Sequence, residues 1–343
     1  MTRSAIPLRF GRCVTTIAAV LALSACNPFA DDATQDVRAA FEAQDYPSAR
    51  DGVAAILEGA PNDATALELM ARIALAMGQG GDALAALERL EADGNAPDDA
   101  ALLRAEGLLQ QGDTAAALTL LADQESAEGH RLRALAARQM GNDDRAAEHF
   151  AAGRSAPGDR SRLFAAEASF HLDRGDLGAA GQAVALANDV APDRIETLFV
   201  TARHAETQGD MVLALARYLR IVEKSPLDRP ALMGAIAASE HVGQPGITRH
   251  LITYGAETRP FDPEFYYQLA RIDAWDGNWE AVRERMQAHE GELQQHGPAR
   301  LLYAEALLNL GQVETARAMA APHLAQRNDA EAARLRAALA AAG

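Results

Sequence analysis

The sequence predicts an all-α protein, an α-solenoid of about nine antiparallel helix pairs with a C-terminal capping helix. The first observation behind this prediction is a glycine that recurs with a period of about 34 residues, a length typical of stacked helical repeats. The members of this series are Gly78, Gly112, Gly141, Gly175, Gly209, Gly243, Gly277 and Gly311, and the step from Gly112 to Gly141 is the one that is shorter. In such an array each unit buries its apolar face against its neighbours.

The second observation is a pair of small residues at constant distances from the glycine. The alanines seven residues before it are Ala71, Ala105, Ala134, Ala168, Ala202, Ala270 and Ala304. The alanines five residues after it are Ala83, Ala117, Ala146, Ala180, Ala214 and Ala316. We expect the glycine to end the first helix of each unit in a left-handed conformation. The alanines then let the two helix axes approach to about 8–10 Å.

The third observation is a proline half a repeat after the turn position, where it stops the second helix. The four prolines are Pro61, Pro192, Pro226 and Pro260. Local departures accompany the pattern. Gln44 stands at the turn position of the first unit, and Ile236, Thr248 and Val282 replace alanines. The third unit is about five residues short, so we expect a trimmed second helix or loop, and a small irregularity, near residues 123–129.

We expect three parts in the chain: a signal peptide at 1–25, an acylated cysteine with a short tether at 26–30, and a solenoid with its capping helix at 31–343. Residues 1–25 combine three arginines with an apolar stretch too short for a comfortable membrane span, as in a secretory signal. Residues 329–341 have helical character and no counterpart one repeat away. They are expected to form the cap that a repeat array needs for solubility.

The ending Leu23-Ser24-Ala25-Cys26 resembles the lipobox of bacterial lipoproteins. This resemblance implies cleavage before Cys26 and acylation of its thiol and amine. Cys26 would then be the only cysteine of the mature chain, because Cys13 leaves with the signal, so it has no intramolecular disulfide partner. We predict a lipid-anchored protein of the cell envelope, at the outer membrane facing the periplasm, because Asn27 follows the cysteine. The alternative is an ordinary signal peptide followed by an incidental cysteine.

The pattern of small residue, glycine, small residue and proline resembles the tetratricopeptide repeat (TPR), most closely over residues 198–226 and 266–286. The resemblance covers about 300 of the 343 residues. It implies a right-handed superhelix whose first helices line a concave groove for a protein or peptide partner. The inward positions of this family give the candidate partner-binding residues Phe199, Arg203, Tyr267, Arg271 and Trp275.

Aromatic and arginine side chains are favoured anchors of protein interfaces, and the guanidinium group suits carboxylates. The alternative is structural. In it the arginines pair with neighbouring acids such as Glu206 or Asp273, and the aromatic rings pack between units.

Composition and motifs narrow the function further. The chain has 32 basic and 48 acidic residues and a formal net charge of −16, which disfavours nucleic acid and anionic lipid surfaces as partners. The sequence has no His-Glu-x-x-His, Cys-x-x-Cys, Gly-x-Ser-x-Gly or P-loop motif, so we expect no enzyme, cofactor or metal. We predict a non-enzymatic interaction scaffold that assists assembly of a pilus, secretion or outer-membrane complex. An adaptor for peptidoglycan or exopolysaccharide enzymes and a structural homo-oligomer are the alternatives.

Overall fold

The computed structural model describes residues 28–325 and 327–342, and within these ranges it contains twenty helices and no strand. The predicted signal peptide and the acylated Cys26 lie outside the described residues. Helix α1 begins at Pro28 and so includes three residues that we expected in the tether. The first ten helices are α1 (Pro28–Glu42), α2 (Tyr46–Gly59), α3 (Ala64–Ala76), α4 (Gly80–Ala92), α5 (Ala100–Gln110), α6 (Thr114–Leu120), α7 (Ala127–Gln139), α8 (Asp143–Gly153), α9 (Ser161–Asp173) and α10 (Leu177–Val190). The remaining helices are α11 (Ile195–Gln208), α12 (Met211–Lys224), α13 (Arg229–Val242), α14 (Pro245–Thr258), α15 (Pro263–Trp275), α16 (Trp279–Ala288), α17 (Glu290–Leu293), α18 (Gly297–Asn309), α19 (Val313–Leu324) and α20 (Ala330–Ala341).

These helices form the predicted units, because consecutive helices pack as pairs and each pair packs on the next. The core is accordingly a row of local apolar clusters between neighbouring units. Every alanine of the two predicted positions is fully buried. Ile236, Thr248 and Val282, which replace alanines, are buried as well. The predicted register is therefore confirmed, and α20 follows the last pair at the place expected for the capping helix.

The turn inside each unit has the predicted left-handed backbone. The eight glycines of the recurrent series have φ between 71° and 83°. Gln44 has φ 63°, and it is the one non-glycine residue with positive φ among the described residues. An aspartate or asparagine follows several of these turns, and its side chain accepts a backbone N–H of the next helix, as Asp210 does from Leu213.

The ends of the second helices also follow the sequence. Helices α2, α10, α12 and α14 each stop two residues before the recurrent proline. Helix α6 has only 7 residues, against 14 in α10 and α12, so the short third unit loses about half of its second helix.

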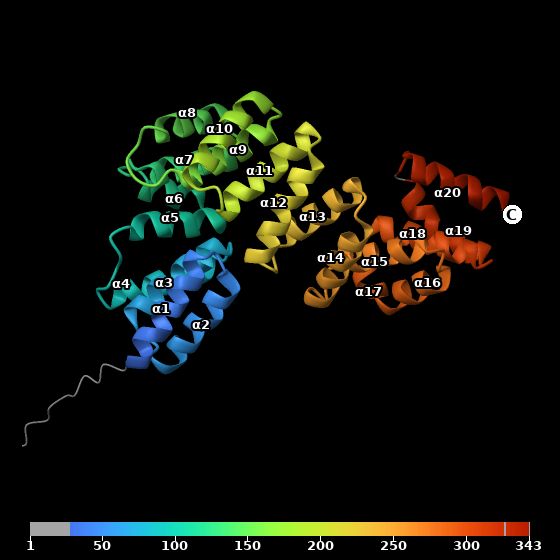
Figure 1. The fold of residues 1–343 in the computed structure, drawn as a ribbon, viewed down its shortest axis with the longest axis horizontal. Coiled ribbons are helices and arrows are strands. Elements are labelled where there is room, and N and C mark those ends of the chain that lie inside the picture. Colours follow the sequence, from blue (N-terminus) through green and yellow to red (C-terminus); the bar gives the residue numbers. More distant parts are fainter. Residues whose placement is uncertain (1–27, 326, 343) are drawn as a thin grey trace, which may run out of the picture.

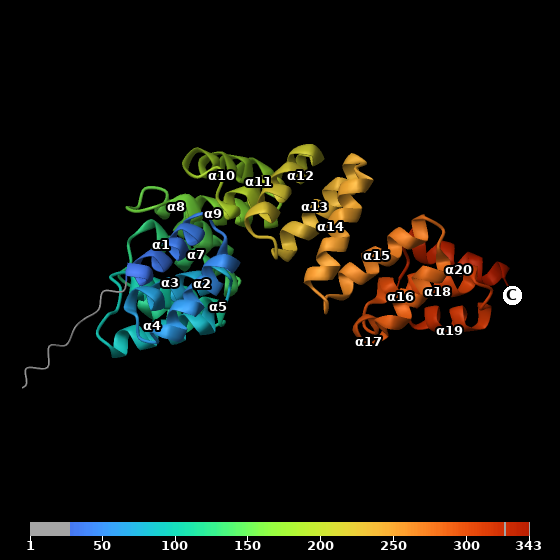
Figure 2. The same ribbon diagram turned by 60° about the horizontal axis from the view of Figure 1, so that its bottom comes forward.

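The array curls and then extends. Helices α1 to α12 wind into one curl, and α13 to α20 lead away from it as an arm that ends at the C-terminus (Figures 1 and 2). The curl brings the first unit back to the sixth, since the Gln44 side chain is hydrogen-bonded to Ile195 at the start of α11. The first helices of the units that complete the curl line the site described next.

Candidate partner-binding site

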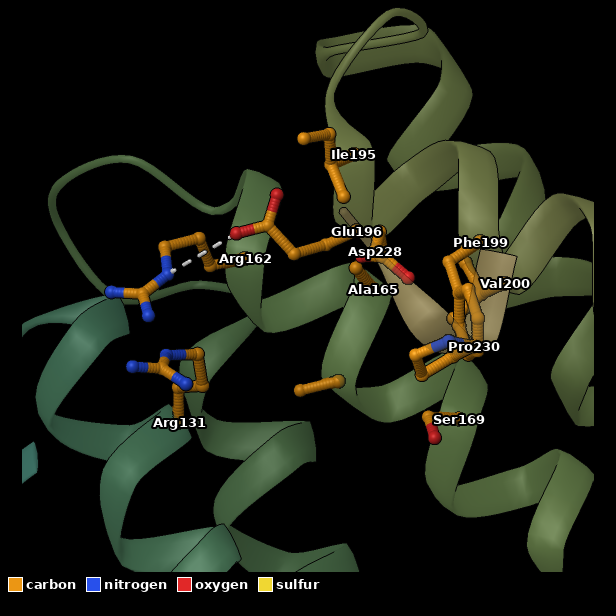
Figure 3. A pocket seen from close by; sticks show the side chains of 11 residues that line it. Arg131, Arg162, Ala165, Ser169, Ile195, Glu196, Phe199, Val200, Asp228 and Pro230 are labelled. Carbon is orange, nitrogen blue, oxygen red and sulfur yellow. Dashed lines mark ion pairs between the residues drawn. The ribbon is translucent and has the colours of Figure 1, made fainter. Parts of the chain in front are cut away.

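A pocket of about 360 Å³ lies among the first helices of four consecutive units, and we call it the α9–α11 pocket. Helix α7 contributes one side chain, α9 and α11 contribute most of the wall, and the start of α13 closes it. Its lining residues are Arg131, Arg162, Ala165, Ala166, Ser169, Ile195, Glu196, Phe199, Val200, Asp228 and Pro230. Figure 3 shows Arg131 and Arg162 at one end and Phe199, Val200 and Pro230 at the other.

The end of the pocket around Phe199 is apolar. Phe199 is half-buried, and its ring meets the ring of Tyr218 on α12 edge-on, with 6.0 Å between centroids. Ile195 and Val200 of the same helix and Pro230 of α13 complete this surface. Asp228 adds a carboxylate, but one of its oxygens accepts the backbone N–H of Ala231 and so caps α13. This end is suited to an apolar side chain of a partner.

The end around Arg131 and Arg162 is a cluster of opposite charges, buried at Arg131 and half-buried at Arg162. Arg131 donates to Glu106 at 2.8 Å and to Glu128 at 2.6 Å. Arg162 also reaches both carboxylates, and its Nη1 lies 2.9 Å from Glu128. Glu196 closes the cluster, with its Oε1 3.8 Å from Arg162 Nε and its Oε2 3.2 Å from Arg194 Nε. The cationic side chains of this pocket are thus already matched by acids of the chain.

The cluster shifts the titration of its acids. Burial alone would raise the pKa of Glu128, but Arg131 and Arg162 outweigh burial and lower that pKa from 4.5 to about 2. Burial also acts to raise the pKa values of Glu106 and Glu196, but nearby arginines lower both. Arg131 and Arg162 lower the pKa of Glu106, and Arg194 and Arg162 lower that of Glu196. All three acids therefore stay ionised at neutral pH, and the cluster ties α5, α7, α9 and α11 together.

Two of the five predicted binding residues lie on α11. Phe199 lines the pocket, and Arg203 lies one turn further along the helix. Arg203 is paired with Asp173 of the preceding unit at 2.9 Å and donates to the Ser169 hydroxyl at 3.2 Å. Asp173 also accepts a hydrogen bond from Arg138 at 2.6 Å, so one carboxylate links the first helices of three units.

The other three predicted residues lie together on α15. The Arg271 guanidinium carbon is 4.9 Å from the centre of the Trp275 ring and 6.0 Å from that of Tyr267. Arg271 also pairs with Glu240 of α13 at 3.4 Å. Trp275 is 60% exposed and lines a second hollow of about 260 Å³, together with Glu240 of α13, the turn that follows it, and the start of α14 at Pro245. The five predicted residues thus form two separate groups.

For the two arginines, the structural alternative is right in kind, but the partners differ from the acids that we named. Arg203 and Arg271 are both paired, but with Asp173 and Glu240 of the preceding units rather than with Glu206 or Asp273. Asp273 instead pairs with Arg285 at 2.9 Å. The packing of successive first helices places an acid of the preceding unit nearer than one on the same helix.

Our prediction missed the ion cluster at Arg131, Arg162 and Glu196. The signal was present, because Glu128, Arg162 and Glu196 occupy the second position of three successive units and alternate in sign. Side chains that occupy the same position of adjacent units are neighbours across the first helices, and alternating charges there favour a ladder of ion pairs.

Within residues 28–325 and 327–342, no group of three or more His, Cys, Asp or Glu side chains is arranged to hold a metal ion. In the same ranges, every helix is too short or too polar to span a bilayer.

No protein-family model matches the sequence, and no curated protein matches it. Solved structures do resemble the fold. The match to the APC/C hetero-tetramer Cut9-Hcn1 has a TM-score of 0.54 at 12% identity and covers 90% of this chain and 55% of that chain. The chain thus spans about half the length of that relative.

Two further matches agree with this fold. Pseudomonas aeruginosa PilF matches with a TM-score of 0.51 at 15% identity, over 60% of this chain and 95% of that chain. An IFIT1 monomeric mutant with Gppp-AAAA matches with a TM-score of 0.50 at 11% identity, over 92% and 72%. At these identities the likeness concerns the fold. Together with the confirmed register of glycines and alanines, it shows that the chain folds as a tetratricopeptide-repeat α-solenoid.

Proposed function

We propose that the protein is a non-enzymatic scaffold that binds an extended segment of a partner protein along the first helices of units six to eight. The observation that carries this proposal is the placement of Phe199 and Trp275. Each lines a hollow between units and leaves part of its ring uncovered, whereas the arginines nearby are matched by acids of the chain. Aromatic anchors in shallow pockets are the usual energetic centres of protein interfaces.

The cellular part of the proposal rests on the lipobox resemblance at Cys26. An acylated N-terminus holds the first unit at the membrane and leaves the curl and arm free to hold a subunit there. We propose that the protein assists assembly of a pilus, secretion or outer-membrane complex at the periplasmic face of the outer membrane.

Site-specific photo-crosslinking in the host cell tests this function. A photoreactive phenylalanine analogue is placed at Phe199 or at Trp275, and the matched control positions are Val190 and Val212, which are exposed on second helices. We expect one envelope protein to be captured from 199 and 275 and not from the controls. Its capture is expected to fall in the Cys26→Ser variant.

The identity of the captured protein decides between the candidate functions. Pilus or secretion subunits support assembly, whereas peptidoglycan or polysaccharide enzymes would favour an adaptor instead. Equal capture from the test and control positions would overturn the proposed binding face.

A further inference from the structure

The first unit contacts the sixth unit, although the two are far apart in the sequence. The Gln44 side chain oxygen accepts the backbone N–H of Ile195 at 2.8 Å, and its amide nitrogen donates to Glu196 at 3.3 Å. On the same seam, Lys224 Nζ donates to the backbone carbonyl of Ala43 at 3.2 Å. The curl in Figures 1 and 2 is therefore a ring that is joined at these residues.

The contact explains why a glutamine stands where the other units have glycine. Gln44 has φ 63°, a left-handed conformation that disfavours residues with a side chain. At the eight glycine turns, an added Cβ would meet nothing within 4 Å, so space for a side chain exists in every unit. Only the first unit uses that space, and its side chain is the one that reaches the sixth unit.

Gln44 also supplies a cap that α11 lacks. The first N–H groups of a helix have no acceptor within the helix. The N-cap residue of α11, Arg194, makes no capping hydrogen bond with its side chain. In contrast, α3, α7, α13 and α15 are capped by their own Asp63, Ser126, Asp228 and Asp262. Gln44 therefore caps α11 from another part of the chain.

The two residues that Gln44 holds belong to the α9–α11 pocket. Ile195 and Glu196 both line it, and Glu196 faces Arg162 at 3.8 Å. Within the described residues, no helix of the first unit packs along a helix of the sixth unit. A hollow of about 480 Å³ lies between the two units instead. Specific polar contacts, rather than a packed interface, set the position of α11 against the first unit.

We propose that Gln44 is a positioning residue that closes the first six units into a ring and thereby fixes the start of α11 in the shape that the α9–α11 pocket needs. This inference rests on the proposed function for its consequence in binding, but the closure itself is testable without a partner.

The first test is amide hydrogen exchange at Ile195 in the full chain. Gln44→Gly removes the acceptor and suits the left-handed turn, so we expect exchange of the Ile195 N–H to become roughly tenfold faster without loss of thermal stability. We also expect the radius of gyration in X-ray scattering to increase.

Gly112→Gln is the matched control, because it puts the same side chain at the turn of the third unit, away from the seam. It should lower thermal stability and leave Ile195 exchange unchanged. Unchanged exchange in Gln44→Gly, or an equal change in both variants, would overturn the closure.

The second test is the photo-crosslinking yield from position 199. We expect Gln44→Gly to lower it several-fold and Gly112→Gln to leave it near the wild-type level. If Gln44→Gly makes the Ile195 N–H exchange faster but does not change the crosslinking yield, the positioning role of Gln44 is overturned, while its role in closing the ring stands. An absence of crosslinks in the otherwise wild-type chain would overturn the proposed function, while the exchange result would still decide the closure.

Discussion

Arg131 of α7 and Glu106 of α5 form an ion pair of 2.8 Å in which the two side chains are only 6% and 9% exposed. Removing one partner of such a pair leaves a buried charge unmatched, at a cost of about 3–5 kcal/mol. We expect Arg131→Met to lower the free energy of unfolding in urea by this amount. The double variant with Glu106→Leu should lose less than the two single variants together. A loss below about 1 kcal/mol in Arg131→Met would show that the cluster is not a structural centre.

Acid should weaken the same cluster. The pKa of Glu128 is about 2 in the folded chain and 4.5 ordinarily, so its ionised form stabilises the fold above pH 4.5. That stabilisation is lost as the pH falls from about 4.5 to about 2, and the lowered pKa values of Glu106 and Glu196 act in the same direction. Urea unfolding from pH 7 to pH 3 measures the effect. Glu128→Gln should flatten the pH dependence, whereas Glu292→Gln, at an exposed side chain of α17, should leave it unchanged.

The position of Ala202 tests the packing of a helix pair. Ala202 is fully buried between helices of the sixth unit, so a large side chain there has no room. We expect Ala202→Trp to destabilise the chain by about 1–3 kcal/mol or more in thermal denaturation. Val212→Trp, at a side chain 66% exposed on α12, should change stability by less than about 0.5 kcal/mol. Equal effects would mean that the assigned register is wrong.

A turn glycine can be compared with a helical one. Gly209 has φ 76°, and Gly59 ends α2 without a positive φ and with open space around its Cα. We expect Gly209→Ala to lower stability by about 1 kcal/mol or more, because alanine is strained at this φ. Gly59→Ala should be neutral or stabilise by up to about 1 kcal/mol. Calorimetry of the two variants at one pH provides the comparison.

The aromatic group on α15 is expected to affect binding more than stability. Trp275 is 60% exposed, and the ion pair of Arg271 is partly exposed, so Trp275→Ala and Arg271→Ala should each cost less than about 1 kcal/mol. Arg203→Ala should behave similarly, because its pair with Asp173 is also partly exposed. Crosslinking from position 199 should fall in all three variants. If the crosslinking yield from position 199 is unchanged in all three variants, Phe199 contacts the partner without help from Arg203, Arg271 or Trp275.

The repeat was predictable because its signals are local. A glycine such as Gly209 sets the turn through its own φ, and an alanine such as Ala202 sets the closest approach of two helices that are adjacent in sequence. Counting residues also showed that the third unit is short, but it did not decide between a shorter helix and a shorter loop; the structure shows a shorter helix, α6. Each of these features depends on one unit and its nearest neighbour.

The arrangement of the site was harder to predict because it depends on how small rotations between units add up. The partner of Arg203 could not be chosen between Glu206 and Asp173 without the relative position of α9 and α11. The contact of Gln44 with Ile195 depends on five successive unit-to-unit steps. The unusual residue at position 44 was visible in the sequence, but its partner was not.

The joined ring also changes the order in which the units should unfold. A linear array of repeats frays at both ends, because a terminal unit has a neighbour on one side only. Here the N-terminal unit has α3 on one side and the seam with α11 and α12 on the other, so it is no longer a true end. Unfolding should therefore start at α20, continue along the arm and reach the curl last. Under tension applied between residue 28 and residue 342, the arm should yield first and the ring last.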